Sequence, residues 1–168
     1  MINIKQDQPD EKAIRRTMTV PASAEQAFAV FTEGLASWWP AEYTWSQEVL
    51  ETIAIEPGAG GRCFERGPHH FECDWGRVLA WEPPRRLVFS WQISPGREPQ
   101  PNPTKASEVE LRFTPEGEMA TRIAFEHRGF DRHGEGGDEY RAALDSPPGW
   151  SYILECYVKA VTAEKRLS

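Results

Sequence analysis

The sequence lacks a long hydrophobic run. None of its 168 residues belongs to a stretch approaching the 18 or so continuous apolar residues that a membrane-spanning helix needs. The first twelve residues, MINIKQDQPDEK, also lack the apolar segment of a secretory signal. We therefore expect a cytoplasmic protein with no membrane partner.

An excess of basic residues is also missing. The chain has 19 Lys and Arg against 26 Asp and Glu, for a formal net charge of −7. Nucleic acids and anionic lipid surfaces attract proteins with basic patches. The charge therefore argues against nucleic acid as a partner.

Cysteine is scarce, and no paired metal-binding motif is present. Cys63, Cys73 and Cys156 form an odd set, which favours free thiols over a disulfide framework. Cys63 and Cys73 flank His69 and His70, but the spacing lacks the CxxC or HxxxH pairs of structural zinc sites. Adjacent histidines in an extended chain point in opposite directions. We expect no metal and no cofactor.

Motifs of common enzyme classes are absent as well. The sequence has no nucleophile elbow, no phosphate-binding glycine loop and no paired-histidine metalloprotease helix. The glycine-rich run at 58–61 connects two expected strands with no helix after it, so it gives little support to a phosphate site.

The strongest positive signal is an amphipathic helix predicted from Gly149 to about Glu164. Its apolar residues recur at helical spacing and form one stripe, made of Trp150, Ile153, Leu154, Tyr157, Val158 and Val161. Glu155 precedes Lys159 by four residues on the opposite face, in the order that favours an ion pair. A stripe of this length needs a broad apolar partner surface.

Alternating apolar and polar residues supply that surface. They predict about seven strands, at 12–20, 49–55, 62–66, 71–81, 87–93, 108–113 and 122–127. Two short helices are expected after the first strand, at 24–31 and 35–40, and a glycine-rich loop at 129–149. The predicted class is α+β, with a curved antiparallel sheet that carries the long last helix on its concave face. We expect residues 1–11 to be a flexible N-terminal segment and residues 12–168 to form one domain.

Several segments resemble a known superfamily. They are Val20-Pro-Ala-Ser-Ala-Glu-Gln-Ala-Phe28, Trp38-Trp39-Pro40, the stretch 76–91, His127-Arg-Gly-Phe130 and Gly149-Trp150. In this order and spacing the chain resembles the SRPBCC (START-like, helix-grip) superfamily, and within it the homologues of the C-terminal domain of the heat-shock ATPase activator. The resemblance implies a sheet that grips the last helix around a hydrophobic cavity. It also implies binding of apolar small molecules, with enzymatic branches in the superfamily.

The leading functional hypothesis is a protein that binds a small apolar or amphiphilic molecule between the sheet and the last helix. Inward-facing and aromatic positions are the expected ligand contacts: Trp38, Trp39, Phe89, Trp91, Phe113, Phe125, His127, Phe130, Trp150, Leu154 and Tyr157. The same aromatic residues would also be able to fill the interior completely.

Charged and titratable residues leave further alternatives open. His127 shares an inward face with Ile123 and Phe125, either as a general base or as a packed histidine hydrogen-bonded to the backbone near the end of its strand. Asp131 and His133 follow in the expected loop. Arg16 and Arg77 each lie among apolar neighbours, either facing a ligand anion or placed at the wet edge.

Two other functions compete with simple binding, and the sequence leaves open whether the protein is an enzyme. One is a small cofactor-independent enzyme, of hydrolase or cyclase type, that uses His127. The other is a protein-interaction module, either as a homodimer or as an activator of a chaperone ATPase. We expect no second domain of the kind that the two-domain activators carry, because 168 residues leave no room for it and its linker.

Overall fold

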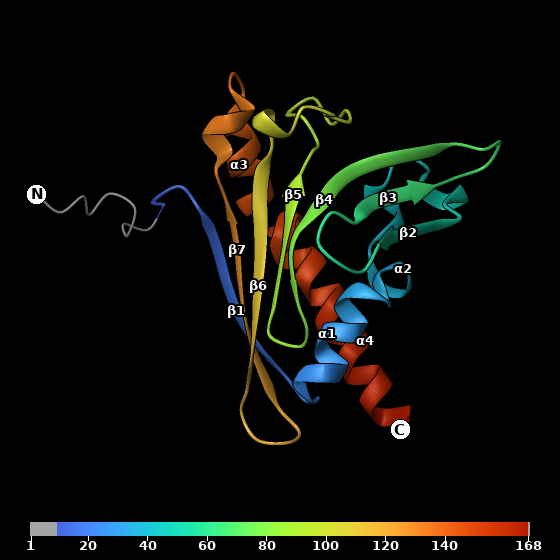
Figure 1. Cartoon of the computed structure of the whole chain (residues 1–168), viewed down its shortest axis with the longest axis vertical. Helices are drawn as coiled ribbons and strands as arrows, with labels where there is room; N and C mark the ends of the chain where they lie inside the picture. The colour runs from blue at the N-terminus through green and yellow to red at the C-terminus, as the bar shows by residue number, and fades with distance from the viewer. Residues whose placement is uncertain (1–9, 168) are drawn as a thin grey trace, which may run out of the picture.

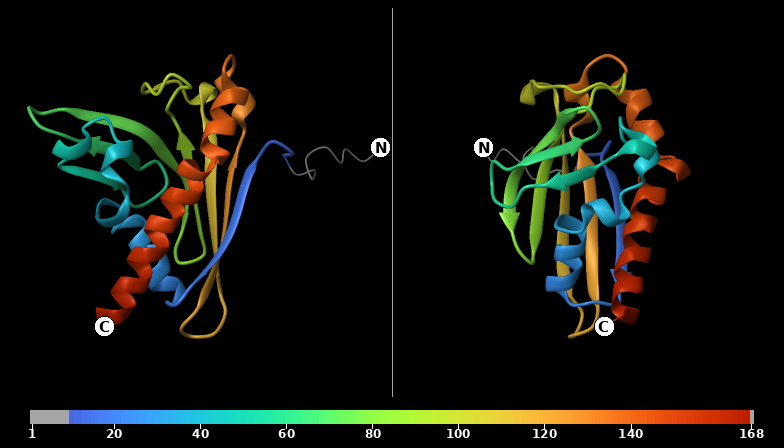
Figure 2. Two further views of the ribbon diagram at one scale, coloured as in Figure 1. Left: turned by 180° about the vertical axis from the view of Figure 1, so that it is seen from behind. Right: turned by 90° about the vertical axis from the view of Figure 1, so that its right-hand side faces the viewer.

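The computed structural model describes residues 10–167 and shows one curled antiparallel sheet that holds a long helix (Figure 1). The strand order is β1-β7-β6-β5-β4-β3-β2, so β1 and β2 form the two edges. The sheet curls around helix α4, which runs along its concave side (Figure 2). The predicted α+β class and helix-grip architecture are confirmed. Residues 1–9 of the expected N-terminal segment lie outside the described residues.

The seven strands follow the alternation in the sequence. Their bounds are β1 (Ile14–Val20), β2 (Thr52–Ile55), β3 (Arg62–Arg66), β4 (Glu72–Glu82), β5 (Arg86–Trp91), β6 (Ser107–Pro115) and β7 (Thr121–Arg128). Along β6, Val109, Leu111 and Phe113 are buried and pair in register with β7. Because successive side chains of a strand face opposite sides, one face of the sheet becomes apolar.

The α-helices are α1 (Ala24–Thr32), α2 (Leu35–Trp38), α3 (Gly137–Asp145) and α4 (Tyr152–Leu167). Single helical turns lie between them: η2 (Ala41–Tyr43), η3 (Gln47–Val49), η4 (Pro103–Lys105), η5 (Phe130–His133) and η6 (Pro147–Ser151). The Ser23 hydroxyl caps α1 by accepting a hydrogen bond of 3.1 Å from the Gln26 N–H. Among the described residues, no helix is long and apolar enough to cross a membrane.

Helix α4 buries most of the predicted stripe, although Val158 is only partly buried. Ile153, Leu154, Tyr157 and Val161 are each at most 4% exposed. The Tyr157 hydroxyl donates a hydrogen bond of 2.7 Å to the Ala27 carbonyl of α1, which joins the two helices over the sheet. The wet face carries an ion pair of 3.1 Å between Glu155 and Lys159.

Two bulges change the faces of β4. Register shifts place Trp75 as an extra residue against β3 and Leu79 as an extra residue against β5. Trp75 is therefore buried, whereas Arg77 is exposed and forms an ion pair of 3.4 Å with Asp74. Arg77 lies on the outer face, so only one of its two expected placements is observed.

Arg16 packs at the edge of the sheet rather than inside it. Its guanidinium donates hydrogen bonds to the Asp145 carboxylate at 2.9 Å and to the Ser151 hydroxyl at 3.1 Å. Strand β1 is thereby tied to the ends of α3 and η6. The arginine is neutralised within the chain and does not face the pocket described below.

Three predicted boundaries need correction. The expected loop at 129–149 contains α3, because Tyr140 and Leu144 form a short inward stripe behind two acidic residues in its first turn. Strand β2 begins at Thr52 because the preceding residues form η3. The last helix begins at Tyr152, because Gly149 has a non-helical backbone (φ −83°, ψ −129°).

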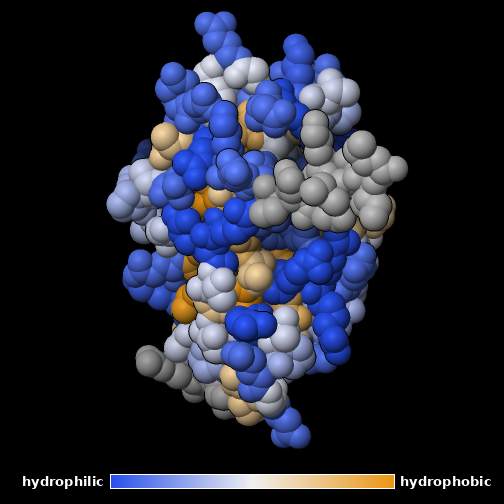
Figure 3. All heavy atoms as spheres, turned by 90° about the vertical axis from the view of Figure 1, so that its left-hand side faces the viewer, coloured by the Kyte–Doolittle hydropathy of each residue, from blue (hydrophilic) through white to orange (hydrophobic). Residues whose placement is uncertain are grey.

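The outer face of the sheet is held by ion pairs. Glu110 is 5% exposed and accepts hydrogen bonds from Arg86 at 2.7 Å and Arg128 at 2.6 Å. Its pKa is lowered because these guanidinium groups outweigh the effect of burial. Seen from the side of β1, the described surface is mainly hydrophilic (Figure 3). This face is therefore solvated, and the apolar residues gather on the concave side.

Candidate functional site

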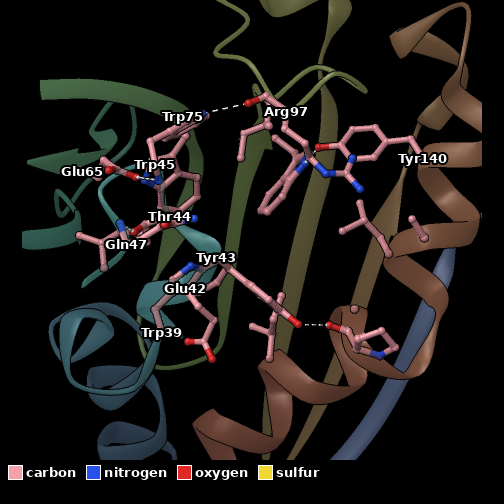
Figure 4. Close-up of a pocket in the computed structure, with 18 of the residues that line it drawn as sticks. Trp39, Glu42, Tyr43, Thr44, Trp45, Gln47, Glu65, Trp75, Arg97 and Tyr140 are labelled. Carbon is pink, nitrogen blue, oxygen red and sulfur yellow. Dashed lines mark hydrogen bonds between the residues drawn. The ribbon is translucent and has the colours of Figure 1, made fainter. Parts of the chain in front are cut away.

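A pocket of about 550 Å³ opens between the β3–β4 arm of the sheet and helices α3 and α4. This volume lies within the range of about 300–1,000 Å³ that is typical of small-molecule sites. Figure 4 shows Trp75, Trp45 and Glu65 on one side of it and Arg97 and Tyr140 on the other. The residues that line it are Trp39, Glu42, Tyr43, Thr44, Trp45, Gln47, Ile53, Glu65, Trp75, Trp91, Ile93, Arg97, Tyr140, Ala143, Leu144, Ser146, Pro148, Gly149 and Ile153.

Three tryptophans form the aromatic wall of the pocket. Trp39 stacks on Trp75, with centroids 6.0 Å apart and an interplanar angle of 23°. Trp91 meets Trp75 edge to face, with ring centroids 6.1 Å apart, and is tilted against Trp39, with centroids 6.4 Å apart. Each of the three is less than 10% exposed. Such rings offer flat apolar surface at little cost in side-chain entropy.

The opposite wall comes from α3, η6 and the start of α4. Gly149 permits the tight turn here, because a Cβ on this residue would lie 2.2 Å from the Leu144 carbonyl oxygen. The turn brings Leu144 and Ile153 to the same side of the pocket. A larger residue at 149 would push α3 away from α4.

Two hydrogen bonds connect the walls across the pocket. The Tyr43 hydroxyl donates to the Pro148 carbonyl at 2.8 Å, and the Trp45 indole N–H donates to the Arg97 carbonyl at 2.9 Å (Figure 4). Both donors belong to the segment 41–49, which follows α2. This segment therefore fastens the arm of the sheet to η6 and to the loop after β5.

Glu65 places a buried carboxylate on the pocket wall. Its side chain is 1% exposed and accepts hydrogen bonds from the Trp45 N–H (3.1 Å), the Ser46 N–H (2.9 Å) and the Ser46 hydroxyl (2.8 Å). Within the described part of the chain, no basic side chain forms an ion pair with it.

Tyr140 and Arg97 form the polar part of the opposite wall. The Arg97 guanidinium lies over the Tyr140 ring, 4.4 Å from its centroid. The Tyr140 hydroxyl oxygen accepts a hydrogen bond of 2.7 Å from the Trp91 indole. Burial raises the pKa of Tyr140 to about 12, against the opposing effect of the Trp91 donor. Tyr140 is therefore a neutral hydroxyl donor at physiological pH.

The structure brings two of the eleven expected ligand contacts to this pocket, namely Trp39 and Trp91. The others are buried in the core and do not line it: Trp38, Phe89, Phe113, Phe125, His127, Phe130, Trp150, Leu154 and Tyr157. They pack against one another, as when Phe125 meets Trp150 at 4.6 Å between ring centroids. Under the middle of the sheet, aromatic side chains fill the space beneath α4.

His127 is fully buried, and both of its ring nitrogens have partners. The Trp150 indole donates to Nδ1 at 2.9 Å, so the His127 proton lies on Nε2, 2.7 Å from the Ser107 hydroxyl oxygen. The Ser107 hydroxyl in turn donates to His133 Nε2 at 2.7 Å. Burial, and less strongly the nearby His133, keep the pKa of His127 well below its usual value. His127 is therefore packed in the core, but its partners are side chains and not the backbone groups that were expected for a packed histidine. Asp131 and His133 also lie off the pocket wall.

The cysteine and histidine cluster is dispersed. Cys63 is fully buried beneath Gly76, whereas His69 and His70 lie in the turn between β3 and β4. In residues 10–164, whose side chains are described, no three His, Cys, Asp or Glu side chains are placed to hold a metal ion.

Sequence reasoning missed most of the pocket, since Glu65, Trp75, Arg97 and Tyr140 were not among its candidates. The sequence pattern could have indicated Glu65, because strand alternation places it on the same inward face as Cys63. It could also have indicated Tyr140, because this residue stands four residues before Leu144. Arg97 lies in an irregular loop, and no pattern marks it.

The family model for "Activator of Hsp90 ATPase homolog 1-like protein" matches residues 21–162. The chain belongs to this family. The match covers every residue that lines the pocket and confirms the predicted SRPBCC assignment. No curated protein matches the chain.

Solved structures with the same fold include proteins of different described functions. An anthrahydroquino-γ-pyrone synthase, Txn09, solved as a complex, is 35% identical over 90% of this chain and 99% of its own, with a TM-score of 0.63. CalC, a self-sacrificing resistance protein from Micromonospora echinospora, is 26% identical over 90% of this chain and 95% of its own, also at 0.63. NE0264 from Nitrosomonas europaea is 13% identical over 94% of this chain and 99% of its own, at 0.64, which shows the fold alone.

Proposed function

We propose that the protein binds a planar, polycyclic aromatic small molecule with oxygen substituents in the pocket between its three tryptophans and α3. The observation that carries this proposal is the wall of Trp39, Trp75 and Trp91 around a volume of about 550 Å³. Flat aromatic surface favours a flat aromatic ligand, through stacking and through removal of apolar area from water. The polar groups of Glu65, Arg97 and Tyr140 suit oxygen atoms on its rim.

The comparison with Txn09 supports this ligand class. That protein is a synthase of an anthrahydroquino-γ-pyrone, which is a fused aromatic product, and it shares 35% of aligned residues with this chain. The similarity spans nearly the whole of both chains, so the shared fold includes the pocket region.

Blocking the pocket tests the proposal. Ala143 and Ala142 are neighbours on α3, but only Ala143 lines the pocket, and both are exposed. We expect Ala143→Trp to weaken binding of anthraquinone by tenfold or more, and Ala142→Trp to leave it unchanged. Equilibrium dialysis measures both affinities. Equal affinities in the two variants would refute binding in this pocket.

A second candidate function is a ring-forming reaction on the same class of molecule, favoured by the synthase described above. Tyr140 supports it, because its neutral hydroxyl and the adjacent Arg97 guanidinium are placed to polarise a ligand carbonyl. This candidate does not use His127, which has no face on the pocket.

Turnover distinguishes binding from catalysis. The protein would be incubated with an anthrahydroquinone that carries an open-chain precursor of a γ-pyrone ring, and ring closure would be followed by mass spectrometry. Catalysis predicts a rate above background that Ala143→Trp abolishes and Tyr140→Phe lowers at least tenfold. If a compound that binds closes its ring no faster with the protein than without it, binding alone remains the proposed function.

A further inference from the structure

The wall formed by β3 and β4 carries two polar groups whose hydrogen-bonding capacity is not fully used within the described chain. We infer that Glu65 and Trp75 form a recognition pair, in which Glu65 accepts a hydrogen bond from a ligand hydroxyl and the Trp75 indole donates one to a ligand carbonyl. This inference rests on the proposed function and narrows the ligand class to hydroxylated aromatic ketones.

Glu65 is a buried carboxylate with spare acceptor capacity. It faces inward because it shares a strand face with Cys63, and burial removes its carboxylate from water at a considerable cost in free energy. Oε2 accepts two hydrogen bonds, both from Ser46, but Oε1 accepts only one, from the Trp45 N–H. A carboxylate oxygen has two lone pairs. One position on Oε1 is therefore available to a donor, and a ligand hydroxyl supplies one.

Trp75 is the complementary case, a buried donor with no acceptor. The residue is 2% exposed, and its indole Nε1 has no hydrogen-bond partner among the described residues. An unsatisfied buried donor costs about 1–3 kcal/mol. The neighbouring Trp91 is different, because its indole already donates to Tyr140. The indole of Trp75 is a donor only, so the partner that it lacks is an acceptor such as a carbonyl oxygen.

The bulge in β4 brings the two groups to one wall. Glu65 pairs with Cys73 across the strands, and Trp75 follows two residues later as the extra residue of the bulge. Residues two apart in a regular strand share a face, so without the bulge Trp75 would lie on the outer face with Arg77. In Figure 4 both residues lie on the side of the pocket that faces Arg97 and Tyr140. An aromatic ring system between these walls would present its substituents to Glu65 and Trp75.

Four compounds of similar shape test the inference on the wild-type protein. Anthracene has no polar atoms, and anthraquinone adds carbonyl acceptors. 2-Hydroxyanthraquinone adds a donor, and 2-methoxyanthraquinone replaces that donor with a group of similar size. We expect anthraquinone to bind about tenfold more tightly than anthracene, and the hydroxy compound about tenfold more tightly than the methoxy compound. Affinities would be measured by equilibrium dialysis near pH 6, where the phenol is neutral.

Variants assign each preference to one residue. Trp75→Phe should abolish the preference for anthraquinone over anthracene, whereas Trp91→Phe should keep it, because the Trp91 N–H is already satisfied within the chain. Glu65→Gln should abolish the preference for the hydroxy over the methoxy compound and leave the other preference intact. If Glu65→Gln fails to fold, the two wild-type ratios and the tryptophan variants still decide the matter.

The outcomes separate this inference from the proposed function. Equal binding of all four compounds, or an unchanged anthraquinone preference in Trp75→Phe, would overturn the recognition pair and leave the aromatic pocket standing. Failure of all four compounds to bind would overturn both.

Discussion

Acidification should destabilise this protein through His127. The Trp150 indole donates to His127 Nδ1, so a second proton on the ring would place two donors against each other. The histidine is also fully buried, which disfavours the charged imidazolium. Both effects keep the folded protein neutral at this position under conditions in which the unfolded chain takes up a proton.

The size and sign of the change in the free energy of unfolding with pH follow from proton linkage. The pKa of a histidine in the unfolded chain is about 6.5, and the pKa of His127 in the fold is well below this value. The free energy of unfolding is therefore not reduced by His127 above about pH 6.5, and it falls as the pH drops from there toward the pKa of His127 in the folded protein. The expected slope for one histidine is about 1.4 kcal/mol per pH unit. His133 acts in the same direction, but less strongly because it is only partly buried.

Urea denaturation at a series of pH values between 7.5 and 5 measures this slope. With an m-value of about 2 kcal/mol/M, the midpoint should fall by about 0.7 M per pH unit below pH 6. Glu110 contributes only at lower pH, because its carboxyl pKa is lowered from 4.5. A midpoint that stays constant from pH 7.5 to 5 would refute the reasoning, because His127 would then be free to protonate in the fold.

His127→Asn is the matched variant for this prediction. An asparagine carbonyl oxygen takes the place of Nδ1 and still accepts from Trp150, but the side chain does not titrate. The variant should be less stable than the wild type and should show a shallower dependence on pH. A steeper dependence would contradict the assignment.

Three substitutions test the fold around the site. Leu154→Asp should cost more than about 4 kcal/mol of stability, because it buries an unpaired charge beneath the sheet, and a melting temperature near the wild type would contradict the assigned face of α4. Gly149→Ala should lower the melting temperature and the affinity for anthraquinone together, since the added Cβ collides with the Leu144 carbonyl; loss of neither would exclude the tight turn. Tyr140→Phe leaves the Trp91 donor unpaired and should cost about 1–3 kcal/mol in urea denaturation, against less for Tyr43→Phe at a residue 45% exposed. Equal losses in the two tyrosine variants would refute the role of the Trp91 bond.

The regular elements were predictable, because their residues face one environment along their whole length. In β7, Ile123, Phe125 and His127 are all buried, and in α4 the apolar stripe continues from Ile153 to Val161. Along these elements each side chain faces either the core or the solvent in a regular order, so periodicity in the sequence is enough to assign the buried face.

Strand β4 and helix α3 were harder, because each breaks its local pattern. Bulges at Trp75 and Leu79 insert single residues and change which side chains face inward, and this shift depends on the partner strands rather than on β4 itself. Helix α3 lies in a segment with several glycines, and only its short stripe of Tyr140 and Leu144 marks it as helical. Local sequence therefore underdetermines the two elements that shape the pocket.

The position of the pocket follows from the twist of the sheet rather than from hydrophobicity. Over strands β5 to β7 the interior is filled by side chains, as where Phe125 of β7 packs against Trp150 of η6. A twisted sheet diverges from a straight helix along its width, and here the β2–β4 arm extends away from α4 (Figure 1). The irregular segments 41–49 and 94–99, the short helix α3 and the turn η6 bridge the resulting gap and supply much of the lining. Inward aromatic residues on the long regular elements therefore mark the filled part of the interior, whereas the open part is bounded largely by short or irregular segments in which the periodicity of the sequence is weak.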